Sequence, residues 1–438
     1  MYQIVQVCVP CVRELVSYNG KSRYHCYDVH LNGIFHSSIR YREFSQLKVK
    51  LEAEFGTFLS KDFPPKAPLL KYLQSQQVET RRLCLENYLR KVLSYSEIAS
   101  CETLTKFLLD CQVATYKRDA NSAVQTIRLD IFNMGKECSS FSVGIDCSTR
   151  DVLQEYFMRI NAPSHFVCKF GLFIGKSSTS NEKVKLVHCL QFFESPFVVL
   201  QKMQMKAKKS ESCGIFVKKL HFSPSLDNDL MRCQATLMLL FSQAKSDIKH
   251  GLFQLSQSVT SELQQFESRR DYFSYVSLCQ ELEGYSYAEF GCKLSTDHSE
   301  NERSGDSILR LGYAKILLDS NEFLKEQQKS SYAYSVVRIK QWKVTQQSST
   351  HASHFKFEYV SNESNETSWI TVTTTEAPLI SQMLQSLIHE MLNANGKTPV
   401  ASRTQSINSS LDERASCSMR TNTQSVNSSF DNITDDDL

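Results

Sequence analysis

Residues 24–41 read YHCYDVHLNGIFHSSIRY, and this stretch carries the strongest structural signal in the first part of the chain. Polar and apolar residues alternate up to Leu31, which is typical of a strand with one buried face. Asn32-Gly33 then favours a tight turn, because both residues tolerate the positive φ angles of a two-residue hairpin. The stretch therefore predicts two antiparallel strands, the second of which ends around Arg40-Tyr41.

Helical spacing follows this hairpin. Apolar residues recur three or four positions apart in two segments, at Phe44, Leu47, Leu51 and Phe55 and again at Leu85, Tyr88, Leu89, Val92 and Leu93. The intervening Phe63-Pro64-Pro65-Lys66 favours an extended conformation, because proline lacks the N–H that a helix interior needs. We expect residues 1–112 to form a small β-sheet with helices.

A second region of mixed pattern covers residues 113–205. Strand-like runs at 127–132, 167–174 and 184–190, a further strand after a turn at 133–135, and a helix capped by Ser148 or Thr149 are compatible with a ubiquitin-like lobe. Residues 206–290 differ, because their apolar residues recur at helical spacing. This spacing predicts a helical bundle for the third region.

Strand patterns return after residue 290. Several runs between 308 and 373 precede an apolar-striped helix at 377–392, which indicates a pleckstrin or phosphotyrosine-binding type of lobe at 291–394. Residues 395–438 are rich in Ser, Asn and Thr, so we expect a disordered tail that ends in a short docking motif. The expected fold class is α+β with several domains.

Composition narrows the function. The 438 residues carry a formal net charge of only +3, which argues against whole-protein attraction to nucleic acid. Fifteen cysteines without paired spacing, and a first segment unlike a signal peptide, favour a reducing cytosol without disulfides. No apolar run reaches the ~18 residues of a membrane span. We expect any membrane contact to be peripheral.

Catalysis is not expected. The sequence has no phosphate-binding glycine loop, zinc-protease motif or nucleophile elbow, so we predict neither an enzyme nor a cofactor. Cys8-x-x-Cys11 suggests half of a zinc site, but a structural site needs four ligands and no second pair stands at a matching spacing. We expect both cysteines to be strand residues and predict no metal.

Three features of the first region together resemble the PX domain. They are Arg40-Tyr41 at a strand end, the Phe63-Pro64-Pro65-Lys66 loop, and Arg81-Arg82 opening a helix with Glu86-Asn87-Tyr88-Leu89. The order of the following lobes, ubiquitin-like, helical and phosphotyrosine-binding-like, resembles a FERM module. The whole chain is thus similar to the PX-FERM sorting nexins.

Three further pieces resemble the sorting nexin 17 subgroup of that family. They are Gln341-Trp342-Lys343-Val344-Thr345, then Phe357-Glu358-Tyr359 with Ser368-Trp369-Ile370-Thr371-Val372-Thr373, and the terminal Asp435-Asp436-Asp437-Leu438. The resemblance covers nearly the whole chain. It implies a cytoplasmic adaptor, peripheral on the early endosome membrane, that retrieves receptors from degradation and recycles them to the cell surface.

The resemblance implies phosphatidylinositol 3-phosphate as the ligand of the PX domain. Arg40 would clamp the 3-phosphate and Tyr41 would stack beneath the inositol ring. Lys66 would meet the other phosphate edge, and Arg81 would bind ring hydroxyls. Arg42 stands where relatives often carry a small polar residue, so it could add a phosphate contact or alter the lipid selectivity.

The resemblance also implies two protein partners. The third FERM lobe would bind Asn-Pro-x-Tyr or Asn-x-x-Tyr cargo tails of transmembrane receptors in a groove formed by Trp342, Val344, Ile388 and Leu392. The cargo would add a strand there. The sequence shows no arginine cluster obviously placed for phosphotyrosine, so we expect the tyrosine to be unphosphorylated. The tail would dock to the Retriever recycling complex through Phe430, Ile433, Asp435, Asp436, Asp437 and the carboxyl-terminal Leu438.

The sequence alone also allows simpler explanations. Arg40, Lys66 and Arg81 could each be solvated surface charges, and Trp342 could equally belong to the core. Ile388 and Leu392 could likewise be core residues of one helix face. Two alternative functions are a FERM-type scaffold placed by its lipid domain, and an effector that binds a Ras-family GTPase through the ubiquitin-like lobe.

Overall fold

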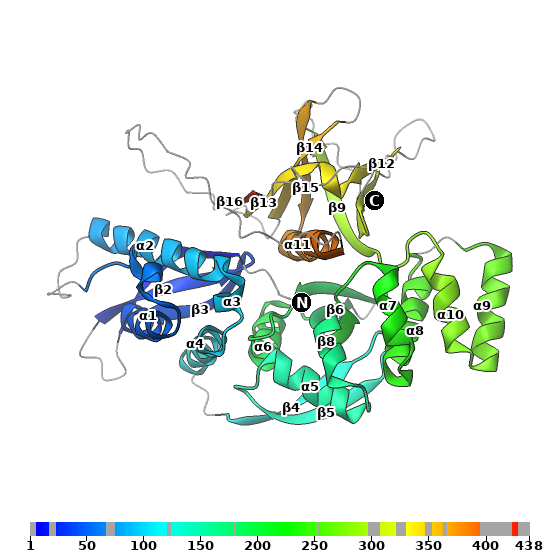
Figure 1. The fold of residues 1–438 in the computed structure, drawn as a ribbon, viewed down its shortest axis with the longest axis horizontal. Coiled ribbons are helices and arrows are strands. Elements are labelled where there is room, and N and C mark those ends of the chain that lie inside the picture. Colours follow the sequence, from blue (N-terminus) through cyan, green and yellow to red (C-terminus); the bar gives the residue numbers. More distant parts are fainter. Residues whose placement is uncertain are drawn as a thin grey trace. The chain divides into compact units, whose positions relative to one another are not determined.

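The computed structural model describes residues 6–16, 23–66, 75–120, 124–178, 181–252, 255–296, 307–320, 330–346, 353–361, 366–394 and 423–427. The chain divides into two compact units, residues 1–285 and 286–438 (Figure 1). In the part of the chain that the structure describes, no helix combines the length and the apolar character that a membrane span requires.

The first unit begins with a three-stranded antiparallel sheet. Its strands, which lie side by side in sequence order, are β1 (Val7–Val16), β2 (Arg23–Leu31) and β3 (Ile34–Arg40). The predicted hairpin joins β2 to β3, with φ angles of 50° at Asn32 and 79° at Gly33. Positive φ at both positions is what a two-residue hairpin turn of this kind requires.

Helices pack on this sheet. They are α1 (Tyr41–Phe55), α2 (Ser75–Ser94) and α4 (Glu102–Ala120), and the short α3 (Ser96–Ala99) packs between α2 and α4. The apolar faces that the sequence predicted are buried, and Phe44, Leu47, Leu85 and Tyr88 share one core cluster with Tyr27 of β2. The helical and strand periodicities therefore identified the core of this domain correctly.

One boundary in this domain was predicted wrongly. The helix that Arg81-Arg82 were expected to open begins at Ser75, so both arginines lie within α2. The first turns of α2 are largely exposed and carry only one apolar residue, Val78. They offer no apolar stripe from which a helix start could be predicted.

The ubiquitin-like lobe follows as a five-stranded sheet with two helices. Its elements are β4 (Thr126–Phe132), β5 (Cys138–Gly144), α5 (Thr149–Arg159), β6 (Phe170–Ser178), β7 (Asn181–Cys189), α6 (Pro196–Lys206) and β8 (Glu211–Lys219). Of the two predicted caps of α5, Ser148 is the one observed, since its hydroxyl accepts a hydrogen bond from the Asp151 N–H at 3.2 Å.

The sheet extends past residue 205, where the sequence placed the end of this lobe. Its strand order is β5-β4-β8-β6-β7, so β8 lies between β4 and β6. It is parallel to β4 and antiparallel to β6. The apolar run of β8 is only Ile215-Phe216-Val217, between lysines and small polar residues, and a run this short gives a weak strand signal.

The helical lobe begins after β8 and contains α7 (Asp227–Met231), α8 (Gln234–Lys249), α9 (Gln257–Arg269) and α10 (Tyr272–Gln280). Its buried residues continue the core of the ubiquitin-like lobe, because Ile131 and Leu172 belong to the same cluster as Leu237 and Val276. Asp227 joins the two lobes by a hydrogen-bonded ion pair with Lys219, 2.6 Å between Oδ2 and Nζ.

In its described residues, the second unit forms an antiparallel sheet with one α-helix. Its elements are β9 (Ala288–Thr296), β10 (Ser307–Gly312), β11 (Lys315–Ser320), β12 (Ser330–Ser335), β13 (Ile339–Gln346), β14 (Ser353–Val360), β15 (Thr367–Thr374), α11 (Ala377–Ala394) and β16 (Thr423–Asn427). Helix α11 packs against β13 and β14 (Figure 1), as expected for a lobe of phosphotyrosine-binding type.

Strand β16 was not predicted. The sheet order is β12-β11-β10-β9-β15-β14-β13-β16, so this short tail segment pairs with β13 at one edge. Its sequence, Thr423-Gln-Ser-Val-Asn427, has a single apolar residue and resembles its surroundings. Backbone groups of the edge strand β13 supply the pairing, and local side-chain patterns do not encode it.

Candidate functional site

The predicted headgroup residues come from three separate segments of the PX domain. Arg40 is the last residue of β3 and Tyr41 is the first residue of α1. Arg81 lies on α2, and Lys66 is an exposed residue at the end of the Pro-Pro segment. The Arg40 N–H donates to Glu43 Oε2 at 2.7 Å, which fixes the start of α1.

Tyr41 connects α1 to the Pro-Pro segment. Its hydroxyl donates a hydrogen bond to the Pro64 carbonyl oxygen at 2.8 Å, and its ring centroid lies 5.8 Å from that of Phe63. Phe63 in turn packs edge-on against Tyr88 of α2, with 5.0 Å between the ring centroids. These contacts hold the loop beside the start of α1.

Arg81 completes the connection. Its Cζ atom lies 4.5 Å from the centroid of the Tyr41 ring, and its Nη2 donates to the Pro65 carbonyl oxygen at 3.4 Å. Partial burial raises the pKa of the Tyr41 hydroxyl, and the Arg81 charge opposes that rise. The phenol therefore stays neutral beside a cation at physiological pH.

The neighbouring Arg82 has a different role. Its guanidinium is buried and forms ion pairs with Glu79 at 2.6 Å and with Glu86 at 3.4 Å. It also donates to the Val9 carbonyl oxygen of β1, while Glu86 accepts from the Val9 N–H at 2.7 Å. Arg82 thus fastens α2 to the sheet, and its carboxylate partners already satisfy its charge.

The structure thus gathers Arg40, Tyr41, Arg81 and the Pro64-Pro65 carbonyls at one end of the small sheet. Lys66 follows Pro65 directly, and Arg42 is exposed on the first turn of α1. Sequence reasoning missed a further neighbour, Tyr24 of β2, whose ring centroid lies 4.0 Å from Arg40 Cζ. The sequence offered one indication of this neighbour, because Tyr24 is the first residue of the hairpin stretch 24–41 that ends with Arg40-Tyr41.

The predicted peptide groove is only partly as expected. Trp342 on β13 is 2% exposed, and its Nε1 donates a hydrogen bond to the Ser381 hydroxyl of α11 at 3.0 Å. Val344 and Ile388 are also buried, whereas Leu392 is half-buried. The Trp342 indole therefore belongs to the packed junction of β13 and α11, which was the simpler of its two explanations.

The edge beside Trp342 is occupied. Strand β16 pairs with β13 in antiparallel register, from Gln341 opposite Asn427 to Thr345 opposite Thr423. A peptide that adds a strand to β13 would need these same backbone groups. The predicted docking residues Phe430, Ile433, Asp435, Asp436, Asp437 and Leu438 lie outside the described residues.

The two N-terminal cysteines lie in strand β1, as predicted, although Cys11 is exposed and Cys8 is buried. The Cys11 thiol donates to Asp28 Oδ2 at 3.4 Å. Burial raises the pKa of this thiol, and the Asp28 charge raises it further. In the described part of the chain, His, Cys, Asp and Glu side chains form no cluster of three that could hold a metal ion.

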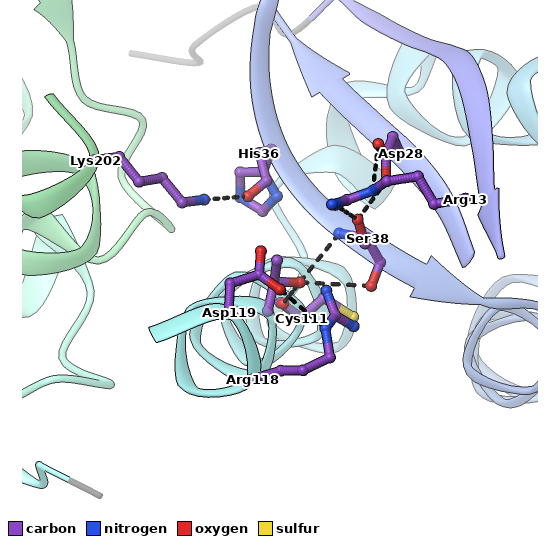
Figure 2. Close-up of polar contacts among 9 residues, drawn as sticks. Arg13, Asp28, His36, Ser38, Cys111, Arg118, Asp119 and Lys202 are labelled. Atoms are coloured by element: carbon purple, nitrogen blue, oxygen red, sulfur yellow. Dashed lines mark hydrogen bonds and ion pairs between the residues drawn. The ribbon is translucent and has the colours of Figure 1, made fainter. Parts of the chain in front are cut away.

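Figure 2 shows polar contacts at the junction of the PX domain and the ubiquitin-like lobe. Lys202 of α6 donates through Nζ to the His36 carbonyl oxygen of β3 at 2.8 Å (Figure 2). Within the PX domain, Ser38 donates its N–H to the Thr115 hydroxyl of α4 at 3.0 Å. Phe193 of the ubiquitin-like lobe enters the PX core cluster. These contacts are structural and hold the first unit together.

Models of known protein families match three separate regions of the chain. A family model described as PX domain matches residues 28–111. A model described as sorting nexin 17/27/31, FERM domain, F1 lobe matches residues 127–222, and one described as sorting nexin 17 FERM C-terminal domain matches residues 289–392. The F1 match includes β8, in agreement with the sheet observed here.

Curated relatives match along most of the chain. Sorting nexin-17 of Rattus norvegicus is 26% identical over 388 residues, which cover 85% of this chain and 79% of that protein. Sorting nexin-31 of Homo sapiens is 25% identical over 396 residues, which cover 88% of this chain and 85% of that protein. With its PX domain and its FERM lobes in this order, the chain belongs to the PX-FERM sorting nexins, in the subgroup of sorting nexins 17, 27 and 31.

Proposed function

We propose that this sorting nexin binds phosphatidylinositol 3-phosphate through its PX domain and receptor tails through its third FERM lobe, and so recycles receptors from endosomes to the cell surface. Membership of the family makes the chain an endosomal sorting adaptor and a peripheral membrane protein. The observation that carries the proposal is the gathering of Arg40, Tyr41 and Arg81 against the Pro64-Pro65 carbonyls.

The chemistry of this end of the PX domain suits an inositol phosphate. A guanidinium presents a planar fork of N–H donors that matches a phosphate, so Arg40 would hold the 3-phosphate. The ammonium of Lys66 is a mobile point charge and would meet the phosphodiester. Arg81 already donates to a carbonyl and lies over the Tyr41 ring, so it would direct its remaining N–H groups at ring hydroxyls.

The second part of the proposal concerns receptor tails. An edge strand offers unpaired N–H and C=O groups to an extended peptide, and strand addition of this kind is a common mode of peptide recognition. The pairing of β16 with β13 supports it, because a segment distant in sequence already adds a strand at this edge. A cargo tail with an Asn-Pro-x-Tyr sequence would replace β16.

Because Trp342 is buried, its role in this binding is to hold the edge in place. The indole and its bond to Ser381 fix β13 against α11, and the peptide would contact the β13 backbone together with the exposed part of Leu392. Docking of the tail to the Retriever complex, and binding of a Ras-family GTPase by the ubiquitin-like lobe, stay predictions that rest on the family resemblance.

Vesicle binding tests the lipid assignment. We expect Arg40→Ala to weaken binding to vesicles with phosphatidylinositol 3-phosphate by about tenfold or more, since charge-assisted hydrogen bonds to phosphate are lost. Lys50→Ala is the matched control, because Lys50 is an exposed cation further along the same helix. Equal binding of the two variants, or equal binding of the protein to vesicles of unphosphorylated phosphatidylinositol, would contradict the proposal.

A further inference from the structure

The strand next to Arg40 is longer than the strand that carries it. The last pair of β2 and β3 is Cys26 opposite Arg40, after which the chain of β3 turns into α1. Strand β2 continues to Arg23 and is held there by β1, with Tyr24 opposite Leu15. Residues two apart on a strand point to the same face, so Tyr24 flanks the position of Arg40.

This overhang brings an aromatic ring to the Arg40 guanidinium. The Tyr24 ring centroid and Arg40 Cζ are 4.0 Å apart, the shortest such separation among the cation–aromatic contacts of the described residues. Both side chains are half-buried. A cation at this distance over an aromatic face is attracted by the ring quadrupole.

We propose that Tyr24 is a positioning residue of the headgroup site, whose ring holds the Arg40 guanidinium ready for the lipid phosphate. This proposal rests on the proposed lipid binding. Tyr24 lies outside the Arg40-Tyr41, Pro64-Pro65-Lys66 and Arg81 segments, and its ring rather than its hydroxyl is the acting group.

Arg40 is held by an aromatic ring, whereas other arginines of this domain are held by carboxylates, and this difference affects phosphate binding. Arg82 is neutralised by Glu79 and Glu86, and Arg13 pairs with Asp28 at 2.8 Å. Within the described ranges of the chain, no carboxylate forms an ion pair with Arg40. A carboxylate would compete with phosphate for the guanidinium N–H groups. An aromatic face leaves the charge and those donors available.

The benefit of the ring is a smaller entropic loss on binding. A free arginine side chain has many rotamers, and phosphate binding must select one of them. The ring restricts the guanidinium before the lipid arrives. Replacement of Tyr24 by leucine removes the quadrupole, and we expect the affinity to fall about three- to tenfold, which is the range of a single cation–π contact.

The experiment measures binding of the full chain to vesicles with phosphatidylinositol 3-phosphate at low ionic strength. The variants are Tyr24→Phe, Tyr24→Leu, Arg40→Ala and the double variant Tyr24→Leu/Arg40→Ala, and thermal unfolding of each shows that the fold is retained. We expect Tyr24→Phe to bind within about twofold of the unchanged protein, because it keeps the ring face. Tyr24→Leu should show the loss stated above.

The double variant separates positioning from direct lipid contact. If Tyr24 acts through Arg40, then Tyr24→Leu causes no further loss once Arg40 is alanine. An equal loss in both backgrounds would mean that Tyr24 contacts the lipid itself and would overturn the proposal. Equal affinity of Tyr24→Leu and the unchanged protein, or a loss in Tyr24→Phe as large as in Tyr24→Leu, would overturn it as well.

Binding of the unchanged protein to phosphoinositide vesicles shows whether a failure concerns the role of Tyr24 alone or the lipid assignment as well. If that protein binds the phosphoinositide and Tyr24→Leu binds equally well, only the positioning role is wrong. If it prefers another phosphoinositide, the same four variants measure the coupling on that lipid. If it binds no phosphoinositide vesicle, both the lipid assignment and the positioning role are wrong.

Discussion

Asp227 lies at the centre of a deeply buried ionic group of the first unit. Its carboxylate forms hydrogen bonds with Lys219 Nζ, His221 Nε2 and the Tyr285 hydroxyl, each at 2.6 Å. Burial by itself would raise the pKa of Asp227. The Lys219 charge and the His221 contacts outweigh burial and lower the pKa to about 2.

This lowered pKa gives a pH dependence with a definite sign. A carboxyl group whose pKa is lower in the folded protein stabilises the fold above its ordinary pKa of 3.8, and that contribution is lost as the pH falls toward 2. We therefore expect the melting temperature to decrease between about pH 4 and pH 2. Thermal unfolding across this range measures it.

Replacement of the carboxylate should be costly at neutral pH. Asp227→Asn leaves the buried Lys219 charge without its partner, which typically destabilises a protein by roughly 3–5 kcal/mol. Asp229→Asn is the matched control, because Asp229 lies on the same short helix and its side chain is 77% exposed. Equal melting temperatures of the two variants, or an unchanged acid transition in Asp227→Asn, would contradict this assignment.

Sequence reasoning identified some residues of the candidate site and missed others, for a physical reason. Arg40, Tyr41 and Arg81 were found because each belongs to a recognisable segment. Tyr24 was missed, because its role depends on β2 extending past the end of β3. That offset appears only in the pairing register, where Cys26 faces Arg40. Trp342 was predicted to line the groove, but its indole is buried and donates a hydrogen bond to Ser381, a contact that depends on how α11 packs on β13.

The edge strand β13 has two competing partners, strand β16 and the proposed receptor tail. It pairs with β16 in the structure, and a receptor tail would need the same backbone groups. Two peptides cannot pair with one strand edge at once. The tail is therefore a competitor of the proposed cargo, and its occupancy reduces the apparent affinity for cargo by the fraction of free edge.

Proline substitution in β16 tests this competition. Alternate residues of an edge strand direct their N–H groups at the neighbour, so Gln424→Pro/Ser425→Pro removes one ladder bond whichever alternation holds. We expect an Asn-Pro-x-Tyr peptide to bind roughly tenfold tighter, the factor for a tail that occupies the edge about nine-tenths of the time. Calorimetric titration of the full chain with the peptide measures the change.

The control for this pair keeps the prolines in the tail but moves them away from the strand. Ser409→Pro/Ser410→Pro lies outside β16 and should leave the peptide affinity unchanged. Weaker binding after substitution in β16 would show that the tail assists the peptide. Equal affinities of the two proline pairs would show that β16 does not compete for the edge.

Elements were predicted well where the signal is local. The β2–β3 hairpin, α1 and α11 each follow from periodicity or turn residues within one short window. Strands β8 and β16 were missed, because both are specified by distant partners: β8 by β4 and β6, and β16 by β13. A short run with one or three apolar residues becomes a strand only when such an edge is available.

The proposed lipid and cargo sites belong to different compact units of the chain. The headgroup residues belong to the first unit, whereas β13 and α11 belong to the second. Deletion of Leu438 should therefore leave binding of phosphatidylinositol 3-phosphate and of cargo peptide unchanged, and remove association with the Retriever complex. Pull-down with the purified complex measures that association, with Ser429→Ala as a control in the same tail.

A retained pull-down after deletion of Leu438 would exclude the terminal leucine as the docking residue. A loss of lipid or peptide binding in the same variant would show that the tail contributes to those sites as well. Either result would revise the division of contacts between the two units and the chain end.

The central place of β8 in its sheet has a consequence for protein synthesis. Strands β4 and β6 do not pair with each other, and the strand that bridges them is the last of the lobe to leave the ribosome. The PX domain can begin to fold as it emerges, in the N-terminal-first order of translation. The sheet of the next lobe cannot close until residue 219 has left the ribosome. Until then, the edges of β4 and β6 that later pair with β8 are unpaired and accessible to chaperones or to strands of other chains.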